Sequence, residues 1–156
     1  MPKLVVLDGY ALNPGDLSWD GFRQLAELIV HDRTSAALVL ERTVDADFIL
    51  TNKTPLNADM LASLPRLKYI GVLATGYNVV DVKTAKARGI TVTNVPSYGS
   101  YSVAQLAFAL ILELCHKVGV HDNAVKNGKW SQNPDWCFWI KPQLELHGKV
   151  MGIVGF

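Results

Sequence analysis

The 156-residue sequence has little of what marks several large classes of protein. Two cysteines, Cys115 and Cys137, are too few for a disulfide-stapled scaffold. The apolar run at residues 4–7 is too short for a signal-peptide core, and the longest such run, residues 106–112, is too short to cross a membrane. Lys and Arg total 15 and Asp and Glu total 14, so bulk charge does not predict nucleic-acid binding. We therefore expect a soluble protein of the reducing cytoplasm, with neither a nucleic-acid nor a membrane partner.

Sequence signatures of metal and nucleophile chemistry are also missing. His116 and His121 are five positions apart, and neither C-x-x-C nor H-x-x-x-H spacing occurs, so we expect no metal site. The sequence has no G-x-S-x-G elbow and no complete P-loop. Apolar residues make up 49% and charged residues 19%, which is typical of a globular protein with a buried core.

Short apolar runs alternate with amphipathic segments through the first ninety or so residues. Strands are predicted at residues 4–7, 29–31, 48–50, 69–73 and 90–93. Helices are predicted at residues 19–28, 36–42 and 57–64, and from a cap at Asp81 as far as Gly89. Strands and helices that alternate at this spacing indicate βαβ units. We therefore predict an α/β fold, a flavodoxin-like doubly wound parallel sheet.

The second part of the chain has a different pattern. Residues 94–99 carry Pro and Gly and are predicted to form a boundary, after which Ser102 and Gln105 match a capping box. The helix predicted over 103–118 is apolar on nearly every face, which is typical of burial between domains or subunits. Residues 122–143 are predicted to be loop-like and hold an aromatic cluster. A new strand is predicted at 149–154.

Two loops are candidates for ligand binding, because ligands of doubly wound sheets bind beyond the carboxyl ends of the strands. One follows the third strand and contains Lys53; the other follows the fourth and contains Thr75 and Gly76. Backbone N–H groups in the second loop can face a carboxylate or phosphate. The alternative is that Thr75 and Gly76 only make a tight turn and that Lys53 is a solvated lysine. Gly155 can be the first glycine of a dinucleotide loop, or simply the end of a buried strand.

Longer stretches of the sequence resemble a known family. NKTP at 52–55, GVLATGYNVVD at 71–81, RGITVTNVP at 88–96, SVAQ at 102–105, GKW at 128–130 and ELHGKVMGIVGF at 145–156 occur in the order found in the D-isomer-specific 2-hydroxyacid dehydrogenases. The resemblance covers essentially the whole chain. Within that family the sequence is most similar to the glycerate dehydrogenase (hydroxypyruvate reductase) group, on Asn52-Lys53 and the stretch 133–137.

This resemblance implies an oxidoreductase that uses NAD or NADP. Family members interconvert 2-keto acids, here hydroxypyruvate or glyoxylate, with D-2-hydroxy acids, here D-glycerate or glycolate. Residues 1–98 would be the flavodoxin-like substrate domain. Residues 99–156 would be the interdomain helix, a dimerisation segment and the first strand of an incomplete Rossmann cofactor domain.

The resemblance also implies roles for particular residues. Asn52 and Lys53 would belong to the substrate pocket, and the backbone amides of Ala74, Thr75 and Gly76 would hold the substrate carboxylate. Thr75 would also lie close to the cofactor. The match places Val103 near the nicotinamide and Gly155 in the nucleotide loop.

The family's catalytic residues are an Arg, an acidic residue and a His, and all of them follow the glycine-rich loop. They are expected beyond residue 156, so His116, His121 and His147 cannot be the family's histidine. We therefore expect the chain to be the N-terminal part of the enzyme and to be inactive alone. We expect a homodimer through 103–118 and 130–139, unless these segments pack on the cofactor domain of the same chain.

Two other classes of protein compete with this interpretation. A truncated, non-catalytic homologue would act as a flavodoxin-like interaction module. A receiver domain would need an acidic pair after the first strand and a phospho-acceptor Asp after the third, whereas Asp8 stands alone and the third strand ends in Thr51-Asn52-Lys53. The receiver interpretation is therefore poor.

Overall fold

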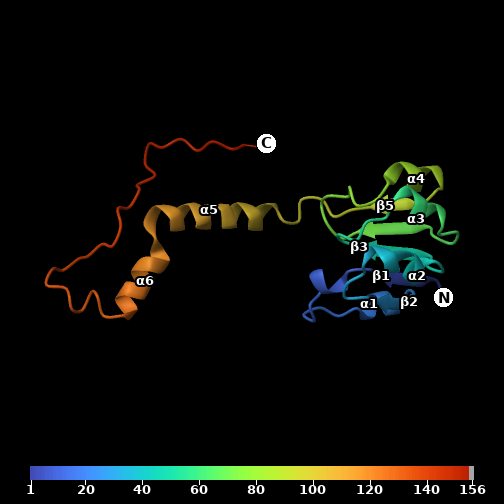
Figure 1. Ribbon diagram of the computed structural model, residues 1–156, viewed down its shortest axis with the longest axis horizontal. Helices are drawn as coiled ribbons and strands as arrows, with labels where there is room; N and C mark the ends of the chain where they lie inside the picture. The colour runs from blue at the N-terminus through green and yellow to red at the C-terminus, as the bar shows by residue number, and fades with distance from the viewer. Residues whose placement is uncertain (155–156) are drawn as a thin grey trace. The chain divides into compact units, whose positions relative to one another are not determined.

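A parallel β-sheet forms the centre of the first of two compact units, Met1–Tyr98 and Gly99–Phe156, in the computed structural model, which describes residues 1–154. Its five strands are ordered β2-β1-β3-β4-β5 (Figure 1). They are β1 (Lys3–Val6), β2 (Glu27–Val30), β3 (Phe48–Thr51), β4 (Tyr69–Val72) and β5 (Thr91–Thr93). This order is that of the flavodoxin-like doubly wound sheets, so the predicted fold class is confirmed.

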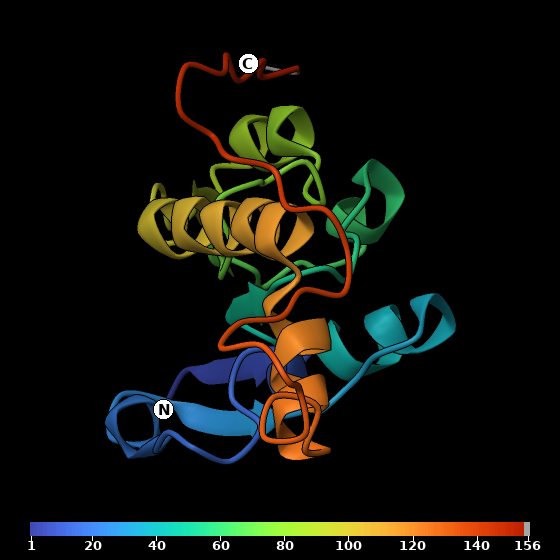
Figure 2. The same cartoon turned by 90° about the vertical axis from the view of Figure 1, so that its left-hand side faces the viewer.

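Helices cover both faces of the sheet, because alternate residues of each buried strand point to opposite sides. One face joins α2 (Val39–Thr43), α3 (Ala58–Ala62) and α4 (Val82–Ala87). This core cluster includes Val5, Ile49, Ile70, Val39, Leu61 and Ala85. The other face packs against the region of α1 (Asp20–Arg23), in a cluster that includes Leu4, Val6, Leu50, Trp19 and Ala26. In Figure 2, α2 in cyan and α3 in blue-green lie on the same side of the sheet.

Both helix caps predicted in this unit form. The side chain of Asn57 accepts a hydrogen bond from the backbone N–H of Met60 at 2.9 Å, at the start of α3. The Asp81 carboxylate accepts one from the N–H of Thr84 at 2.7 Å, at the start of α4. Each cap satisfies an N–H group that the first turn of a helix leaves without a partner.

The helix predicted over 19–28 is wrong in its extent. Only α1, Asp20–Arg23, is helical, and β2 begins at Glu27. The N–H of Glu27 donates to the carbonyl of Pro2 at 2.9 Å, and Leu28 pairs with Leu4. Pairing with β1 thus overrides the helical periodicity of these residues. The helix predicted over 36–42 is divided into a 3-10 turn, η2 (Ala36–Leu38), and α2; a similar turn, η1 (Gly9–Ala11), follows β1.

In the second unit the long helix is α5, Ser100–His116, rather than 103–118. Its N-cap is Gly99, without a side-chain hydrogen bond, so the predicted capping box of Ser102 and Gln105 does not form. Lys117 then adopts a left-handed conformation with φ of 53°, and α6 (Val118–Lys126) follows. The sequence pattern missed α6, which carries a mixed set of polar and apolar residues.

The strand predicted at 149–154 is also wrong for the residues that the structure describes. No strand is assigned there, and Val150 and Val154 are 96% and 101% exposed. A parallel strand needs a neighbour for its N–H and C=O groups, and the rest of residues 1–154 does not provide one. Gly155 lies outside the described residues. Within them no single helix is long and apolar enough to cross a membrane; α5 and α6 meet that test only as a pair bent by 60°.

Candidate functional site

The sheet brings the two candidate loops to one edge. Since β3 and β4 are parallel neighbours, the residues that follow them lie side by side at the carboxyl edge. The N–H of Leu73 donates to the carbonyl of Thr51 at 2.8 Å, which continues the pairing one step past the strands. Asn52 and Lys53 therefore start beside the turn of residues 74–76.

The turn at 74–76 is held through its carbonyl groups and one hydroxyl. The N–H of Val95 donates to the Ala74 carbonyl at 3.1 Å, and the side-chain amide of Asn94 donates to the Thr75 carbonyl at 2.8 Å. The Thr75 hydroxyl donates to the carbonyl of Val95 at 3.2 Å. Among residues 1–154 none of the hydrogen bonds uses the N–H of Thr75 or Gly76, and both residues are exposed. Two adjacent donors are thus available to an anion.

The loop after β3 is organised differently, around the carboxylate of Asp8. This carboxylate accepts hydrogen bonds from the backbone N–H groups of Asn52, Lys53 and Thr54 at 2.8, 2.5 and 3.0 Å. The Thr54 hydroxyl donates a fourth at 3.3 Å. Asp8 lies two residues after the end of β1 and is buried. The backbone donors of this loop are therefore already occupied.

Gly9 lets the chain pass closely over β2 immediately after Asp8. Its N–H donates to the carbonyl of His31 at 2.8 Å. A Cβ placed on Gly9 would lie 2.6 Å from Cγ1 of Val30, a distance that real side chains do not adopt.

Desolvation lowers the pKa of the half-buried His31, and the nearby Arg42 guanidinium lowers it further, so this imidazole is neutral near pH 7.

The remaining predicted site residues differ in their surroundings. Asn52 is half-buried and Lys53 is exposed, and no hydrogen bond or ion pair of its ammonium occurs within residues 1–154. Ala74 is buried and only its backbone can reach a ligand. Val103 belongs to the second unit, in the first turn of α5, where it is 69% exposed.

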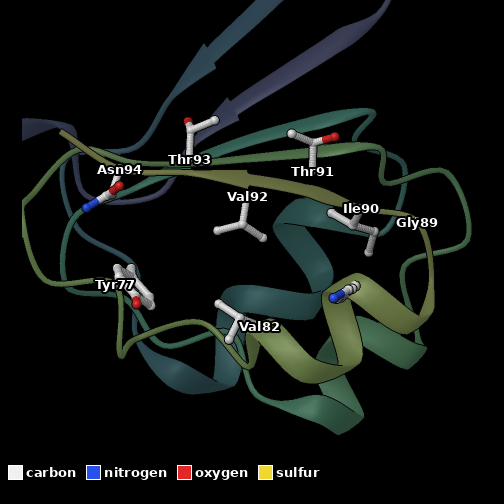
Figure 3. Close-up of a pocket in the computed structure, with 9 residues that line it drawn as sticks. Tyr77, Val82, Gly89, Ile90, Thr91, Val92, Thr93 and Asn94 are labelled. Atoms are coloured by element: carbon white, nitrogen blue, oxygen red, sulfur yellow. The ribbon is translucent and has the colours of Figure 1, made fainter. Parts of the chain in front are cut away.

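A groove of about 580 Å³ lies elsewhere in the first unit, along the outer edge of β5. Figure 3 shows Tyr77, Val82 and Val92 around it, and Lys86 of α4 also lines it. The groove holds neither Asn52 nor Lys53, and of the 74–78 turn it includes only Tyr77. It is an uncovered sheet edge rather than the predicted substrate site.

In the second unit an aromatic cluster packs on α6. The indole N–H of Trp130 donates to the carbonyl of Trp136 at 3.0 Å, and the Trp130 and Phe138 rings are 5.8 Å apart. Nδ1 of His121 donates to the Lys117 carbonyl at 2.9 Å, and its Nε2 accepts from the N–H of Ile140 at 3.3 Å. Both ring nitrogens of His121 thus form hydrogen bonds with the backbone, and neither is left for proton transfer.

Within residues 1–154 the structure contains no group of three His, Cys, Asp or Glu side chains that could hold a metal ion. The first unit instead offers two exposed N–H donors and a lysine at one sheet edge, an arrangement suited to a small anion such as a carboxylate.

Residues 10–136 match the family of D-isomer specific 2-hydroxyacid dehydrogenases, in its catalytic domain. The chain belongs to this family. It is 57% identical over 157 residues to a hydroxypyruvate reductase of Blautia hydrogenotrophica. The aligned region covers 99% of this chain and 49% of the relative. It is 36% identical over 118 residues to a glycerate dehydrogenase of Methylorubrum extorquens, covering 76% and 38%. The chain thus spans half or less of the length of these relatives.

Solved structures of 2-hydroxyacid dehydrogenases have the same fold. One is an NADPH-dependent glyoxylate/hydroxypyruvate reductase of Sinorhizobium meliloti in complex with citrate, with a TM-score of 0.69 and 26% identity, covering 95% of this chain and 45% of that one. The same reductase in complex with NADP and malonate gives a TM-score of 0.63 and 27% identity, covering 94% and 44%.

In this 2-hydroxyacid dehydrogenase chain the structure brings Asn52, Lys53 and the 74–76 turn together at one sheet edge. Sequence reasoning missed Asp8 as part of this edge and treated it only as a lone acid. The signal that could have found it is the position of an acid directly after the first strand, next to the third strand in a flavodoxin-like order.

Proposed function

We propose that the chain is the N-terminal part of an NAD(P)-dependent dehydrogenase that interconverts 2-keto acids with D-2-hydroxy acids. The substrates are hydroxypyruvate or glyoxylate, and the products are D-glycerate or glycolate. Family membership and the 57% identity to a hydroxypyruvate reductase support this assignment. The observation that carries it is the pair of N–H donors at Thr75 and Gly76, which no hydrogen bond within residues 1–154 uses, at the same sheet edge as Lys53.

The substrate carboxylate would bind these two N–H groups, because charge-assisted hydrogen bonds from fixed backbone donors are strong and directional. The side-chain amide of Asn94 holds the turn by a 2.8 Å hydrogen bond to the Thr75 carbonyl. The N–H groups of Thr75 and Gly76 therefore need little reorganisation when substrate binds. The Lys53 ammonium would add positive charge on the β3 side of the pocket. This region therefore binds and orients the keto acid.

The cofactor would be NAD or NADP, which supplies the hydride for carbonyl reduction. Residues 1–154 do not form a nucleotide-binding fold by themselves, since 149–154 have no strand partner. Thr75, Val103 and Gly155 are the proposed cofactor contacts of this part of the enzyme. The Sinorhizobium reductase is NADPH-dependent, and one of its structures is a complex with NADP and malonate. The Arg, acidic residue and His that perform the chemistry would come from the other half of the enzyme.

The test compares the full-length protein with the 156-residue chain. The full-length protein should oxidise NADH or NADPH in the presence of hydroxypyruvate or glyoxylate, followed by the loss of cofactor absorbance. The 156-residue chain at equal concentration should show no turnover. A full-length protein that reduces neither keto acid would refute the proposed substrate class. Turnover by the 156-residue chain would refute the proposal that the catalytic residues lie in the other half of the enzyme.

We also propose a homodimer formed through 103–118 and 130–139. Apolar side chains of α5 are exposed in the single chain, and they include Val103, Leu106, Phe108, Leu110, Leu112 and Leu114. Trp136 and Trp139 are 87% and 71% exposed. An exposed apolar surface of this kind favours association. Light scattering of the full-length protein should give the mass of a dimer, and a monomer at high concentration would contradict the proposal.

The second candidate function is a non-catalytic interaction module, favoured by the same exposed face of α5. It would bind a partner protein without reducing any keto acid, so the activity assay separates it from the first. For either function we place the protein in the cytoplasm, where the two free cysteines, Cys115 and Cys137, would stay reduced. Fractionation of cells with an antibody to the chain would check the compartment.

A further inference from the structure

We propose that Asp8 is a positioning residue of the substrate pocket. Its carboxylate fixes the loop Asn52–Lys53–Thr54 so that the side chains of this loop, and not its amides, face the keto acid. The inference rests on the proposed function, because it assigns a role within that same pocket. Asp8 itself does not touch the reacting atoms.

The geometry that carries the inference is a carboxylate held in a backbone nest. Three consecutive N–H groups, those of Asn52, Lys53 and Thr54, converge on Asp8 at 2.8, 2.5 and 3.0 Å. Successive N–H groups that point to one side form a concave anion site, which usually receives a ligand. Here the anion belongs to the chain itself. The loop conformation is therefore set before any substrate binds.

The carboxylate is itself rigidly placed. Asp8 is 8% exposed, and its neighbours Leu7 and Gly9 are bound on both sides. The N–H of Leu7 donates to the Leu50 carbonyl at 3.0 Å, towards β3, and that of Gly9 donates to His31 at 2.8 Å, towards β2. Asp8 thus lies between β1 and β3, where the strand order of the sheet reverses. Movement of the loop would require movement of the sheet.

This arrangement divides the work between the two loops of the pocket. The amides of 52–54 are occupied, so the substrate carboxylate is left with the N–H groups of Thr75 and Gly76. Lys53, whose N–H is bound to Asp8, presents its ammonium from a fixed backbone. Its position relative to the substrate then depends on Asp8, although the two side chains make no contact among the hydrogen bonds of the described residues.

Asp47 provides a matched control at the opposite end of the same strands. It is 5% exposed and also joins β1 to β3, because it accepts a hydrogen bond from the N–H of Lys3 at 3.0 Å. It also pairs with Arg66 at 2.8 Å and Lys68 at 3.4 Å. Removing its charge should weaken contacts at that end of the sheet without a direct effect on the substrate loop.

The experiment compares Asp8→Asn and Asp47→Asn in the full-length enzyme, with hydroxypyruvate as substrate. For Asp8→Asn we expect KM to rise about tenfold and kcat to fall less than about threefold, since the loop binds substrate but carries no chemistry. Asp47→Asn should lower the melting temperature and leave KM within about twofold of wild type. Adding Lys53→Met to Asp8→Asn should raise KM less than the product of the single effects, because both act through one loop. Equal KM changes in the two Asn variants would overturn the inference.

A second readout needs neither activity nor a stable variant. In the wild-type protein the N–H of Lys53 should exchange with solvent slowly, although its side chain is exposed and it lies in a loop. Exchange as fast as that of an unstructured loop amide would overturn the role of Asp8, whatever the enzyme reduces. The full-length protein could instead reduce no keto acid while this amide is protected from exchange. That result would refute the proposed function and, with it, the role of Asp8 in a substrate pocket. It would still confirm the hydrogen bonds between Asp8 and the loop.

Discussion

The side-chain amide of Asn94 donates a hydrogen bond to the carbonyl oxygen of Thr75, 2.8 Å away. The two residues are 19 positions apart, and the bond ties the chain leaving β5 to the turn after β4. The Thr75 hydroxyl in turn donates a hydrogen bond to the carbonyl of Val95 at 3.2 Å. The turn whose N–H groups are proposed to bind the substrate is thus held through its carbonyl groups and the Thr75 hydroxyl.

Replacing Asn94 by Ala should weaken substrate binding in the full-length enzyme. The Thr75 carbonyl loses its donor and the turn becomes more mobile, so we expect KM for hydroxypyruvate to rise about fivefold. Steady-state kinetics would measure this. Thr93→Ala is the control: its hydroxyl is 2.6 Å from that of Tyr69, and within residues 1–154 no hydrogen bond joins it to the turn. A similar KM for both variants would contradict the role of Asn94.

Lys53→Met should raise KM more at low salt than at high salt. The ammonium is exposed, so dissolved salt screens its electrostatic attraction for the substrate carboxylate. We expect an increase of about fivefold at low ionic strength, and a smaller one when salt is added. Lys83→Met removes another exposed charge, from α4, and should leave KM unchanged. A KM of Lys53→Met that does not depend on salt would contradict a charge effect.

Ile49→Ala should destabilise the first unit strongly. Ile49 is fully buried at the centre of the sheet, between Val5 and Ile70, and its truncation leaves a cavity. The free energy of unfolding should fall by about 2–5 kcal/mol. Urea denaturation of residues 1–98, which hold this whole core, would measure it. Val44→Ala, at a site 47% exposed, should change stability by less than about 0.5 kcal/mol.

Asp47 should contribute to the acid sensitivity of the fold. The backbone N–H of Lys3 lowers its pKa below the usual 3.8, more than burial raises it, and Arg66 and Lys68 lower it further. A pKa that is lower in the folded state stabilises the fold above the unfolded-state value, and this contribution is lost as the pH falls through the folded value. Asp47→Asn should therefore show a shallower loss of stability than wild type below about pH 4.

Thermal unfolding of the two proteins across this pH range would measure the difference. The exposed residue Asp16 supplies the control, since Asp16→Asn should follow the wild-type curve. Parallel curves for wild type and Asp47→Asn would contradict the assignment.

Most of the first unit could be predicted from its sequence, because local and tertiary preferences agree there. The runs at 48–50 and 69–73 are apolar and end in turn residues, and the caps at Asn57 and Asp81 act within one turn of the chain. At residues 27–28 the two preferences disagree. The sequence repeats with a helical period, but pairing with β1 makes them a strand.

The site could be predicted only where a single loop carries the signal. Asn52, Lys53 and the 74–76 turn follow predicted strands, so the edge they share follows from the fold. The nest around Asp8 joins residues 44 to 46 positions apart, and no local pattern reveals such a contact. The strand predicted at 149–154 failed for a related reason, since a strand exists only with a neighbour to pair with.

The 2.6 Å approach between a Cβ at position 9 and Cγ1 of Val30 constrains how this sequence can vary. Gly9 lies in η1 and Val30 at the end of β2, and position 9 can gain a side chain only if position 30 becomes smaller. Among natural variants of the chain, any residue larger than glycine at position 9 should be accompanied by a smaller one at position 30. A Gly9→Ala library screened for restored folding should accordingly return second-site changes at Val30 before changes anywhere else in β2.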